Sequence, residues 1–462
     1  MVRAKPSISM HIHILGICGT FMAGIASLAK SSGHKVTGCD KNVYPPMSTQ
    51  LKEQDITIIE GFDKDQISLN PDIYIIGNVI TRGNPLMETI LTKNLPFQSG
   101  PQWLYENILH EKWVLAIAGT HGKTTTTAML TWILEYNKMA PGYLIGGIPT
   151  NFKSSARLPI ETKKNVPSFF VIEGDEYDTA FFDKRSKFIH YHPRTLVLNN
   201  LEFDHADIFD NLEHIKKHFH HLIRIMPQEG QIISNAESNA LRETLDMGTW
   251  SEIEYFSDEK GWSYQINEGW HSLSISYKNK NQGVLNWDLI GHHNASNALA
   301  AIAAAKHVGI TPENAIEALS LFKGVKKRME KIASYDNGIN LYDDFAHHPT
   351  AIMTTLAGIK KTKLKGRIIA VIEPRSNTMK LGSMKKELIN SLKDADKIYC
   401  YANNLSWNAK ELFAHSQNVI VSDNIDLLAN KIAQDQQNED QIIFMSNGSF
   451  ANIQTKVDTL LQ

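Results

Sequence analysis

The 462-residue sequence has few cysteines and no long apolar run, and each absence narrows the class of protein. Its three cysteines, Cys18, Cys39 and Cys400, are too few and too scattered for a disulfide framework. No apolar stretch is long enough to span a membrane, and residues 1–9 lack the apolar core of a signal peptide. We therefore predict a cytoplasmic protein without membrane insertion.

An excess of charge of one sign is also missing. Lysine and arginine (47) nearly balance aspartate and glutamate (49), and the formal net charge is −2. Because there is no basic field and no run of like charges, the composition predicts no nucleic-acid partner. The hydrophobic content of 42% is that of a globular protein, and the length implies about three domains. The sequence carries no signal for an oligomeric state.

Short apolar strands alternate with helix-like stretches along the chain, which is typical of α/β folds with parallel sheets. We predict domains at residues 10–110, 111–325 and 326–462. The seams are expected between Ser99–Pro101 and Trp113, and at Gly324–Arg328. The outer two domains are predicted to be Rossmann-like, and the central one to be an α/β domain of the phosphate-loop ATPase type.

Individual elements follow from the same patterns. Alternating residues at Ile253–Phe256 and Ser272–Tyr277 predict some antiparallel strand in the central domain. An alanine-rich helix is expected at Ala295–His307, with Asn294 as a fair N-cap. The remaining predicted strands are His11–Leu15, Lys35–Cys39, Ile56–Glu60, Ile73–Ile76, Phe169–Ile172, Thr195–Leu198, Ile339–Tyr342, Arg367–Ile372, Lys397–Tyr401, Val419–Val421 and Gln441–Met445.

The most informative stretch is residues 114–125, where an apolar strand meets the glycine turn Gly119–Thr124 and a helix follows. In this order, backbone N–H groups and the positive end of the helix dipole face an anion. Lys123 can reach the β- and γ-phosphates, and the Thr124 hydroxyl is placed to ligate Mg²⁺. Ile117 stands where the Walker pattern has its first glycine. The stretch still predicts ATP or GTP binding.

Other strand ends carry polar residues whose roles the residues alone leave open. Glu173 follows a buried strand, where a Mg²⁺ ligand or a solvated acidic loop would both fit. The segment 199–207 could hold a metal, orient a phosphate or cap a helix. Arg375, at the end of another strand, is suited to a planar carboxylate. Cys18 lies near a helix N-terminus, which could lower its thiol pKa, although a passive loop residue is the plainer interpretation.

The first glycine loop admits an alternative class of function. Gly16 and Gly19 end a strand, and Asp40 follows about twenty residues later, as in dinucleotide-binding folds. A nicotinamide-dependent oxidoreductase is therefore one alternative, but the spacing misses Gly-x-Gly-x-x-Gly and leaves Lys123 without a role. A nucleotide-switched binding protein without chemistry is another.

Taken together, the motifs resemble the Mur ligase family over nearly the whole chain. The ordered motifs are Gly-Thr-His-Gly-Lys-Thr-Thr, Glu-x-Asp-Glu, Asn-x-x-x-x-Asp-His, Gly-x-His-Asn-x-x-Asn and Asp-Asp-Phe-x-His-His-Pro. Longer strings at Gly16–Met22, Tyr177–Lys187 and Asn199–Phe209 resemble the branch that recycles murein peptide. The resemblance implies a ligase that uses ATP and Mg²⁺ to join UDP-N-acetylmuramate to L-Ala-γ-D-Glu-meso-diaminopimelate through an acyl phosphate. The alternative is the ligase that adds L-alanine to the same sugar.

The resemblance also implies a role for each matching residue. Lys123, Glu173, His205 and Arg328 would be catalytic, with Thr124, Glu173 and His205 as metal ligands. Gly16, Gly19 and Asp40 would bind the UDP-sugar, and Arg375 would meet the peptide acceptor. His347 or His348 could assist deprotonation of the amine, with core or capping roles equally open. The ATP site would comprise Gly119, Thr120, His121, Gly122, Lys123, Thr124, Thr125, Asn294, Arg328, Asp344 and Phe345.

Overall fold

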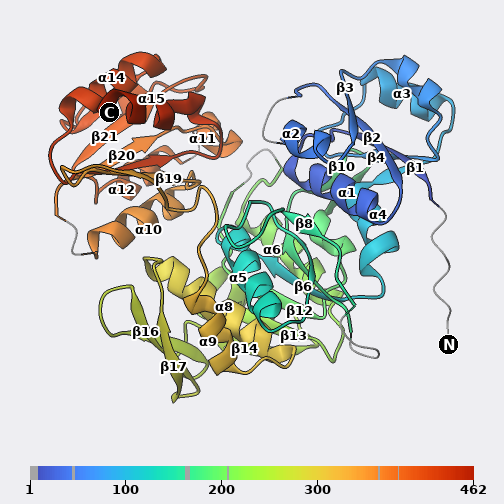
Figure 1. Ribbon diagram of the computed structural model, residues 1–462, viewed down its shortest axis with the longest axis horizontal. Helices are drawn as coiled ribbons and strands as arrows, with labels where there is room; N and C mark the ends of the chain where they lie inside the picture. Colours follow the sequence, from blue (N-terminus) through green and yellow to red (C-terminus); the bar gives the residue numbers. More distant parts are fainter. Residues whose placement is uncertain (1–8, 44–46, 162–166, 205–207, 363–364, 383) are drawn as a thin grey trace.

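The structure is a computed structural model that describes residues 9–43, 47–161, 167–204, 208–362, 365–382 and 384–462. Three large sheets, each with flanking helices, form three lobes, and the N-terminal and C-terminal lobes lie at different sides of the central one (Figure 1). The predicted three-domain α/β fold is confirmed. Among the described helices, none combines the length and the apolar composition needed to cross a bilayer.

The N-terminal lobe contains a parallel sheet in the order β3-β2-β1-β4-β5. Ser99 pairs with Ile76 in this sheet and its hydroxyl caps the next helix, so the Ser99–Pro101 end of the predicted seam lies within the N-terminal lobe. Its strands are β1 His11–Leu15, β2 Lys35–Asp40, β3 Thr57–Glu60, β4 Ile73–Ile76 and β5 Phe97–Ser99. Its helices are α1 Thr20–Ser31, α2 Met47–Lys52, η1 Lys64–Leu69, α3 Pro85–Thr92, α4 Gly100–Leu104 and η2 Tyr105–Leu109.

The central lobe contains a ten-stranded mixed sheet in the order β17-β16-β15-β14-β13-β12-β6-β9-β7-β8. Its strands, with the β10–β11 hairpin, are β6 Trp113–Ala118, β7 Gly142–Leu144, β8 Ala156–Arg157, β9 Phe169–Gly174, β10 Asp178–Ala180, β11 Asp183–Ser186, β12 Thr195–Leu198, β13 Gln231–Asn235, β14 Glu252–Phe256, β15 Trp262–Ile266, β16 Ser272–Tyr277 and β17 Lys280–Asn286. Its helices are α5 Lys123–Tyr136, η3 Lys187–His190, α6 Leu212–Arg224, α7 Asn239–Asp246, α8 His292–His307 and α9 Pro312–Ser320.

The structure tests two sequence predictions in this lobe. Within residues 231–287 the predicted antiparallel strand is confirmed at β16, which is antiparallel to both neighbours, whereas β14 pairs in parallel with β13. Helix α8 begins one turn earlier than expected, with Gly291 as its N-cap, and Asn294 therefore lies inside the helix. The alanines of α8 are buried and let α5 pack closely against it.

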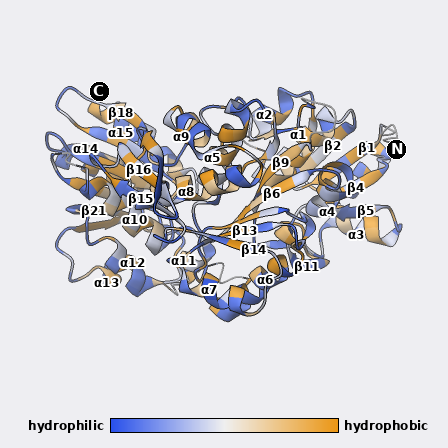
Figure 2. Ribbon diagram, turned by 90° about the horizontal axis from the view of Figure 1, so that it is seen from below, coloured by the Kyte–Doolittle hydropathy of each residue, from blue (hydrophilic) through white to orange (hydrophobic). Residues whose placement is uncertain are grey.

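The arrangement of β12, β6 and β9 positions the site. These strands are adjacent and parallel, with Ala118 of β6 opposite both Leu198 of β12 and Gly174 of β9. Their apolar residues are buried, and β6 and β9 are orange through the centre of Figure 2. Because parallel strands end at the same edge, the three polar segments that follow these strands meet there.

The C-terminal lobe contains a six-stranded sheet in the order β18-β19-β23-β20-β21-β22. The edge strand β18, which is antiparallel to β19, was not expected from the sequence. The strands are β18 Glu330–Ser334, β19 Asn340–Asp344, β20 Ile368–Ile372, β21 Lys397–Tyr401, β22 Val419–Ser422 and β23 Gln441–Met445. The helices are α10 Pro349–Lys360, α11 Asn377–Leu381, α12 Lys385–Ser391, α13 Ala409–Leu412, α14 Ile425–Asp435, η4 Phe450–Asn452 and α15 Ile453–Leu461.

Candidate functional site

A cavity of about 1860 Å³ lies where the three lobes meet. It is lined by nearly all of the predicted site residues, and these come from every lobe. Gly119 is not among the lining residues, and His205 lies outside the described residues. The predicted residues that line the cavity are Gly16, Gly19, Asp40, Thr120, His121, Gly122, Lys123, Thr124, Thr125, Glu173, Asn294, Arg328, Asp344, Phe345 and Arg375.

The turn between β6 and α5 requires glycine at two positions. Gly119 has φ +150°, and Gly122, the N-cap of α5, has φ +77°. A Cβ on Gly122 would lie 2.6 Å from the Oδ1 atom of Asn297, closer than side chains approach one another. The loop is also tied to the end of β12, because the backbone N–H of His121 donates to Oδ1 of Asn200 at 2.7 Å. The backbone is thereby held with the N-terminus of α5 facing the cavity, as an anion site requires.

Lys123 is paired with a carboxylate that the sequence analysis did not single out. Its Nζ atom donates to Oε2 of Glu176 at 2.9 Å and to the Gly119 carbonyl at 2.6 Å. The side chains of Lys123 and Glu176 are only 16% and 2% exposed. Burial lowers the pKa of Lys123, but the charges of Glu176, Asp175 and Glu173 and the hydrogen bond to Glu176 together outweigh burial and raise it, so the ammonium keeps its proton. Glu176 belongs to the acidic segment after β9, and its spacing from Lys123 gave no signal of this pairing.

Thr124 and Glu173 lie together as predicted. The Thr124 hydroxyl donates to Oε2 of Glu173 at 3.2 Å, and the Gly146 N–H donates to Oε1 at 2.5 Å. Burial raises the pKa of Glu173, although both hydrogen bonds and the charges of Lys123 and Arg328 oppose the shift. A hydroxyl and a carboxylate side by side are hard oxygen donors of the kind that Mg²⁺ prefers.

Arg328 brings the C-terminal side of the chain to the phosphate loop. Its guanidinium donates to the Thr124 hydroxyl at 3.2 Å and lies 4.6 Å from the ring centre of Phe345. Asp344 accepts from the backbone N–H groups of Met329 and Ala346, both at 2.7 Å, and so holds the two loops together. Burial raises the pKa of Asp344 to about 6, against the charge of Arg328. Removal from water likewise lowers the pKa of Arg328.

In the N-terminal lobe, Asp40 organises the glycine loop after β1. Its Oδ2 atom accepts from the Cys18 N–H at 2.9 Å, and Gly16 adopts φ +79°. A Cβ on Gly16 would lie 2.9 Å from Val79. Burial, reinforced by the charge of Asp40, raises the pKa of Cys18 to about 11. The hypothesis of a lowered thiol pKa is therefore wrong, since the carboxylate opposes thiolate formation.

Arg375 lines both the main cavity and an adjoining pocket of about 280 Å³. Its guanidinium crosses Gly448 so closely that a Cβ there would lie 2.3 Å from a guanidinium nitrogen. Lys380 also lines this pocket. The nearby Lys385 is not among its lining residues, and its Nζ atom lies 5.7 Å from the ring centre of Trp407. The pocket therefore offers two separate cations beside the main cavity.

The remaining polar residues are held by local contacts. Asn294 donates to the Ile290 carbonyl at 2.8 Å while it lines the cavity. His348 is the N-cap of α10 and accepts from the Thr350 N–H at 3.3 Å, as a capping role requires. Ring nitrogen Nδ1 of His347 faces the Phe345 carbonyl at 2.9 Å. Burial lowers the pKa of both histidines to about 4, so both are neutral near pH 7.

Three protein-family models match successive parts of the chain that correspond to the three lobes. The family model for the catalytic domain of the Mur ligase family matches residues 11–112. The Mur ligase middle domain matches residues 117–305, and the Mur ligase, glutamate ligase domain, matches residues 327–448.

Individual relatives span the whole chain. UDP-N-acetylmuramate–L-alanyl-γ-D-glutamyl-meso-2,6-diaminoheptandioate ligase from Escherichia coli K12 is 50% identical over 97% of this chain and 97% of its own. The crystal structure of a murein peptide ligase from Psychrobacter arcticus 273-4 is 43% identical, with a TM-score of 0.76 over 98% of this chain and 99% of its own. UDP-N-acetylmuramate–L-alanine ligase from Clostridium acetobutylicum is 30% identical over 85% of this chain and 83% of its own.

Proposed function

The chain belongs to the Mur ligase family, and from this premise we propose that it joins UDP-N-acetylmuramate to L-alanyl-γ-D-glutamyl-meso-diaminopimelate at the expense of ATP. The observation that carries the proposal is the convergence of Lys123, Thr124 and Glu173 with Arg328 on one cavity. Two relatives named for this tripeptide reaction are 50% and 48% identical over 97% of the chain, whereas the L-alanine ligases are 28–30% identical. We propose that the domain 10–110 binds UDP-N-acetylmuramate and the domain 111–325 binds ATP. The domain 326–462 would bind the ribose and adenine of ATP and the peptide acceptor.

The proposed ATP site lies between the central and C-terminal lobes. Backbone N–H groups of the turn Gly119–Thr125 would bind the phosphates, with Lys123 released from Glu176 toward the β- and γ-phosphates. Asn294 would contact the nucleotide, Asp344 the ribose and Phe345 the adenine. Arg328 already reaches Thr124 across this gap, which supports a role for Arg328 at the transferring phosphoryl group.

Mg²⁺ fits the oxygen donors of Thr124 and Glu173, which are 3.2 Å apart. Bound there with ATP, the ion would neutralise charge on the phosphate oxygens. We also propose His205 as a ligand of a second Mg²⁺ ion, and this proposal is based only on the resemblance to the family.

The reaction needs positioning and charge stabilisation but no protein nucleophile. An oxygen of the muramoyl carboxylate attacks the γ-phosphorus of ATP and forms a new O–P bond. The bond between the γ-phosphorus and the bridging oxygen of ADP breaks, which gives an acyl phosphate and ADP. Lys123 and Arg328 stabilise the charge spread over the transferring oxygens. The tripeptide amine then attacks the acyl carbon and loses a proton. The bond between the acyl carbon and the bridging oxygen breaks, and that oxygen leaves with inorganic phosphate. We propose His347, which lines the cavity, or His348 as the group that would take this proton.

Gly16, Gly19 and Asp40 are proposed for the UDP-sugar, and Arg375 for the acceptor. In free alanine a carboxylate lies beside the reacting amine. In the tripeptide the alanine carboxylate is part of an amide, and the negative charges lie further from the reacting amine. The adjoining pocket supports the longer acceptor, because Arg375 and Lys380 lie at its wall beside the main cavity. ATP and a nucleotide sugar as substrates also favour a cytoplasmic reaction.

Ligation by the purified protein tests this function. The protein is incubated with Mg-ATP, UDP-N-acetylmuramate and either the tripeptide or L-alanine, and products are weighed by mass spectrometry. We expect the tripeptide adduct with stoichiometric ADP. Efficient ligation of alanine with none of the tripeptide would replace the proposed acceptor by the alternative one, and ATP turnover without ligation would overturn the ligase assignment.

A further inference from the structure

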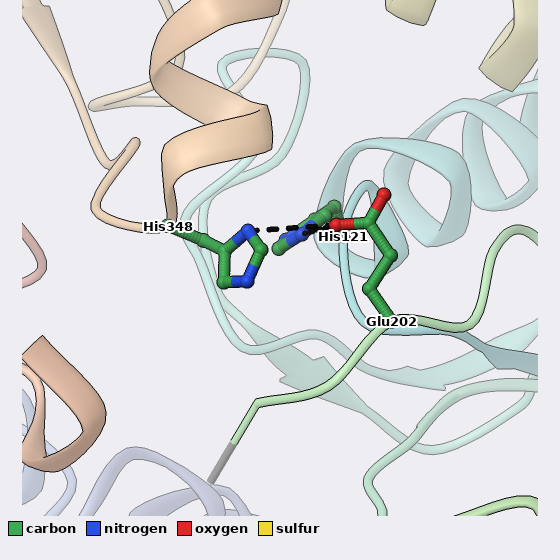
Figure 3. A group of neighbouring side chains, drawn as sticks. All are labelled: His121, Glu202 and His348. Carbon is green, nitrogen blue, oxygen red and sulfur yellow. Dashed lines mark hydrogen bonds and ion pairs between the residues drawn. The ribbon is translucent and has the colours of Figure 1, made fainter. Parts of the chain in front are cut away.

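Three side chains from separate segments meet beside the phosphate loop: His121, Glu202 and His348 (Figure 3). His121 lies in the turn before α5, Glu202 follows β12, and His348 precedes α10 of the C-terminal lobe. One nitrogen or oxygen from each lies within 4.8 Å of the other two. The cluster therefore joins the central and C-terminal lobes beside the phosphate loop.

The ring orientation of His348 brings an acceptor nitrogen close to a carboxylate. Its Nε2 atom lies 3.3 Å from the Phe203 carbonyl, which can only accept, so the ring proton belongs on Nε2. Nδ1 is then an acceptor, and among the described residues it receives the long Thr350 N–H contact of 3.3 Å while it lies 3.5 Å from Oε2 of Glu202.

Neither of these two acceptor groups carries a proton near neutral pH. Burial lowers the pKa of His348 to about 4. Burial raises the pKa of Glu202, but the hydrogen bond and charge of His121, with smaller contributions from Thr350 and His348, outweigh burial and hold it at about 2. Two acceptors that face each other without a proton are a place for a cation.

Two of the three spacings between ligand atoms fit a small tetrahedral ion. Nε2 of His121 lies 3.3 Å and Nδ1 of His348 lies 3.5 Å from the same Glu202 oxygen. Ligands bonded at the Zn–N and Zn–O lengths of about 2.0–2.1 Å in a tetrahedron are about 3.3 Å apart. In addition, a histidine ligand typically donates its second ring N–H to a backbone carbonyl, as His348 does to Phe203.

We propose that His121, Glu202 and His348 form a binding site for a divalent transition-metal ion of the Zn²⁺ class. Two imidazoles and one carboxylate select such an ion over Mg²⁺, which prefers the all-oxygen pair of Thr124 and Glu173. The bound ion ties the start of α10 to the phosphate loop and so restrains the C-terminal lobe. A fourth position remains for water or a ligand in the cavity, which His121 and Glu202 line.

Cobalt binding to the metal-free full-length protein tests the site without substrates. We expect one Co²⁺ per chain, with visible absorption of tetrahedral intensity, displaced by Zn²⁺ but not by excess Mg²⁺. His348→Ala and Glu202→Gln each weaken binding more than about tenfold, since even the loss of an outer-shell partner costs about 10–100-fold. Circular dichroism checks that each variant is folded. The two substitutions lie in different lobes, so the test remains decisive if one of them fails to fold.

Three control variants separate this site from its neighbours. His347→Ala removes the adjacent histidine, Glu173→Gln disables the proposed Mg²⁺ site, and His218→Ala disrupts the histidines on α6, where the rings of His214 and His218 are 5.1 Å apart. Each control should keep the Co²⁺ affinity and spectrum. Absence of Co²⁺ binding, or its loss in a control while His348→Ala retains it, would overturn the proposal. Because no nucleotide or sugar is present, these outcomes do not depend on the proposed function.

Discussion

Lys123 and Glu176 form a pair that is buried in the wall of the cavity, at 16% and 2% exposure. A buried pair is costly to break from one side, because the remaining charge stays buried and loses the opposite charge beside it. The same lysine is proposed to stabilise the transferred phosphoryl group. Stability and catalysis at Lys123 therefore have separable causes.

Lys123→Met should lower kcat by about 10²–10³-fold, the usual effect of removing a group that stabilises transition-state charge. It should also lower the free energy of unfolding by about 3 kcal/mol, because Glu176 then stays buried without the charge of the lysine. The double variant Lys123→Met with Glu176→Gln should recover stability but not kcat. Steady-state kinetics and urea unfolding measure both, and a double variant that recovers turnover would contradict the role of Lys123.

Glu202 provides a pH dependence whose sign follows from its pKa. That pKa, about 2, lies below the ordinary value of 4.5, so ionised Glu202 stabilises the folded state. The contribution is fully present above pH 4.5 and is lost as the pH falls toward 2. In metal-free buffer, Glu202→Gln should therefore destabilise the protein near neutral pH and much less in acid close to the folded-state pKa. Urea unfolding of both proteins measures the difference, and a difference that does not vary with pH would refute this explanation.

At the scale of elements, the strand–turn–helix unit of β6 and α5 depends on the conformation of Gly122. Its φ of +77° costs other residues about 1–2 kcal/mol. A side chain there would in addition meet Asn297 and Asn199 at 2.6 and 3.0 Å. Strain and collision thus act together at the N-terminus of α5.

Gly122→Ala should therefore weaken ATP binding and destabilise the protein by more than the backbone cost alone. Gly61→Ala is the matched control, since Gly61 has φ +86° but a Cβ there would meet no atom within 4 Å. The control should lose about 1–2 kcal/mol of stability and keep its ATP affinity. Calorimetric titration with ATP and thermal unfolding measure both effects. Equal losses in the two variants would show that collision at Gly122 is unimportant.

The elements that position the site were predictable from local sequence. The strands β1, β12, β21 and β23 match the predicted bounds, because short apolar runs between polar turns are local signals. The edge strand β18 was missed because it is half-exposed and polar in sequence. The parallel pairing of Ile253–Phe256 with β13 was not predictable either, since alternation does not reveal which strand becomes the neighbour.

The site was predictable as a set of residues but not as a set of contacts. Glycine spacing and motif order led to Lys123, Glu173 and Arg328, all of which line the cavity. The Lys123–Glu176 pair and the His121–Glu202–His348 cluster depend on how strand ends and lobes come together. Such long-range proximity has no signature in the spacing along one sequence.

At the scale of the whole molecule, polar contacts tie the C-terminal lobe to the phosphate loop and to the end of β12. Arg328 reaches Thr124 at 3.2 Å, His348 reaches the Phe203 carbonyl at 3.3 Å, and the Thr378 hydroxyl donates to Asp204 at 2.9 Å. These contacts lie around a cavity large enough for several substrates. We therefore expect the lobe to close over bound nucleotide.

Small-angle scattering should show a smaller radius of gyration when a non-hydrolysable ATP analogue and UDP-N-acetylmuramate are both present. Either ligand alone serves as the control for simple binding, and Mg²⁺ is kept constant. Identical scattering curves with and without both ligands would contradict closure.

Transfer of oxygen from sugar to phosphate tests the central claim most directly. UDP-N-acetylmuramate labelled with ¹⁸O in its carboxylate is ligated to the tripeptide in the presence of Mg-ATP, and the released phosphate is analysed by mass spectrometry. Activation of the carboxylate at the γ-phosphorus predicts that each phosphate carries one oxygen from the labelled carboxylate. Phosphate without ¹⁸O would contradict an acyl phosphate formed in this cavity.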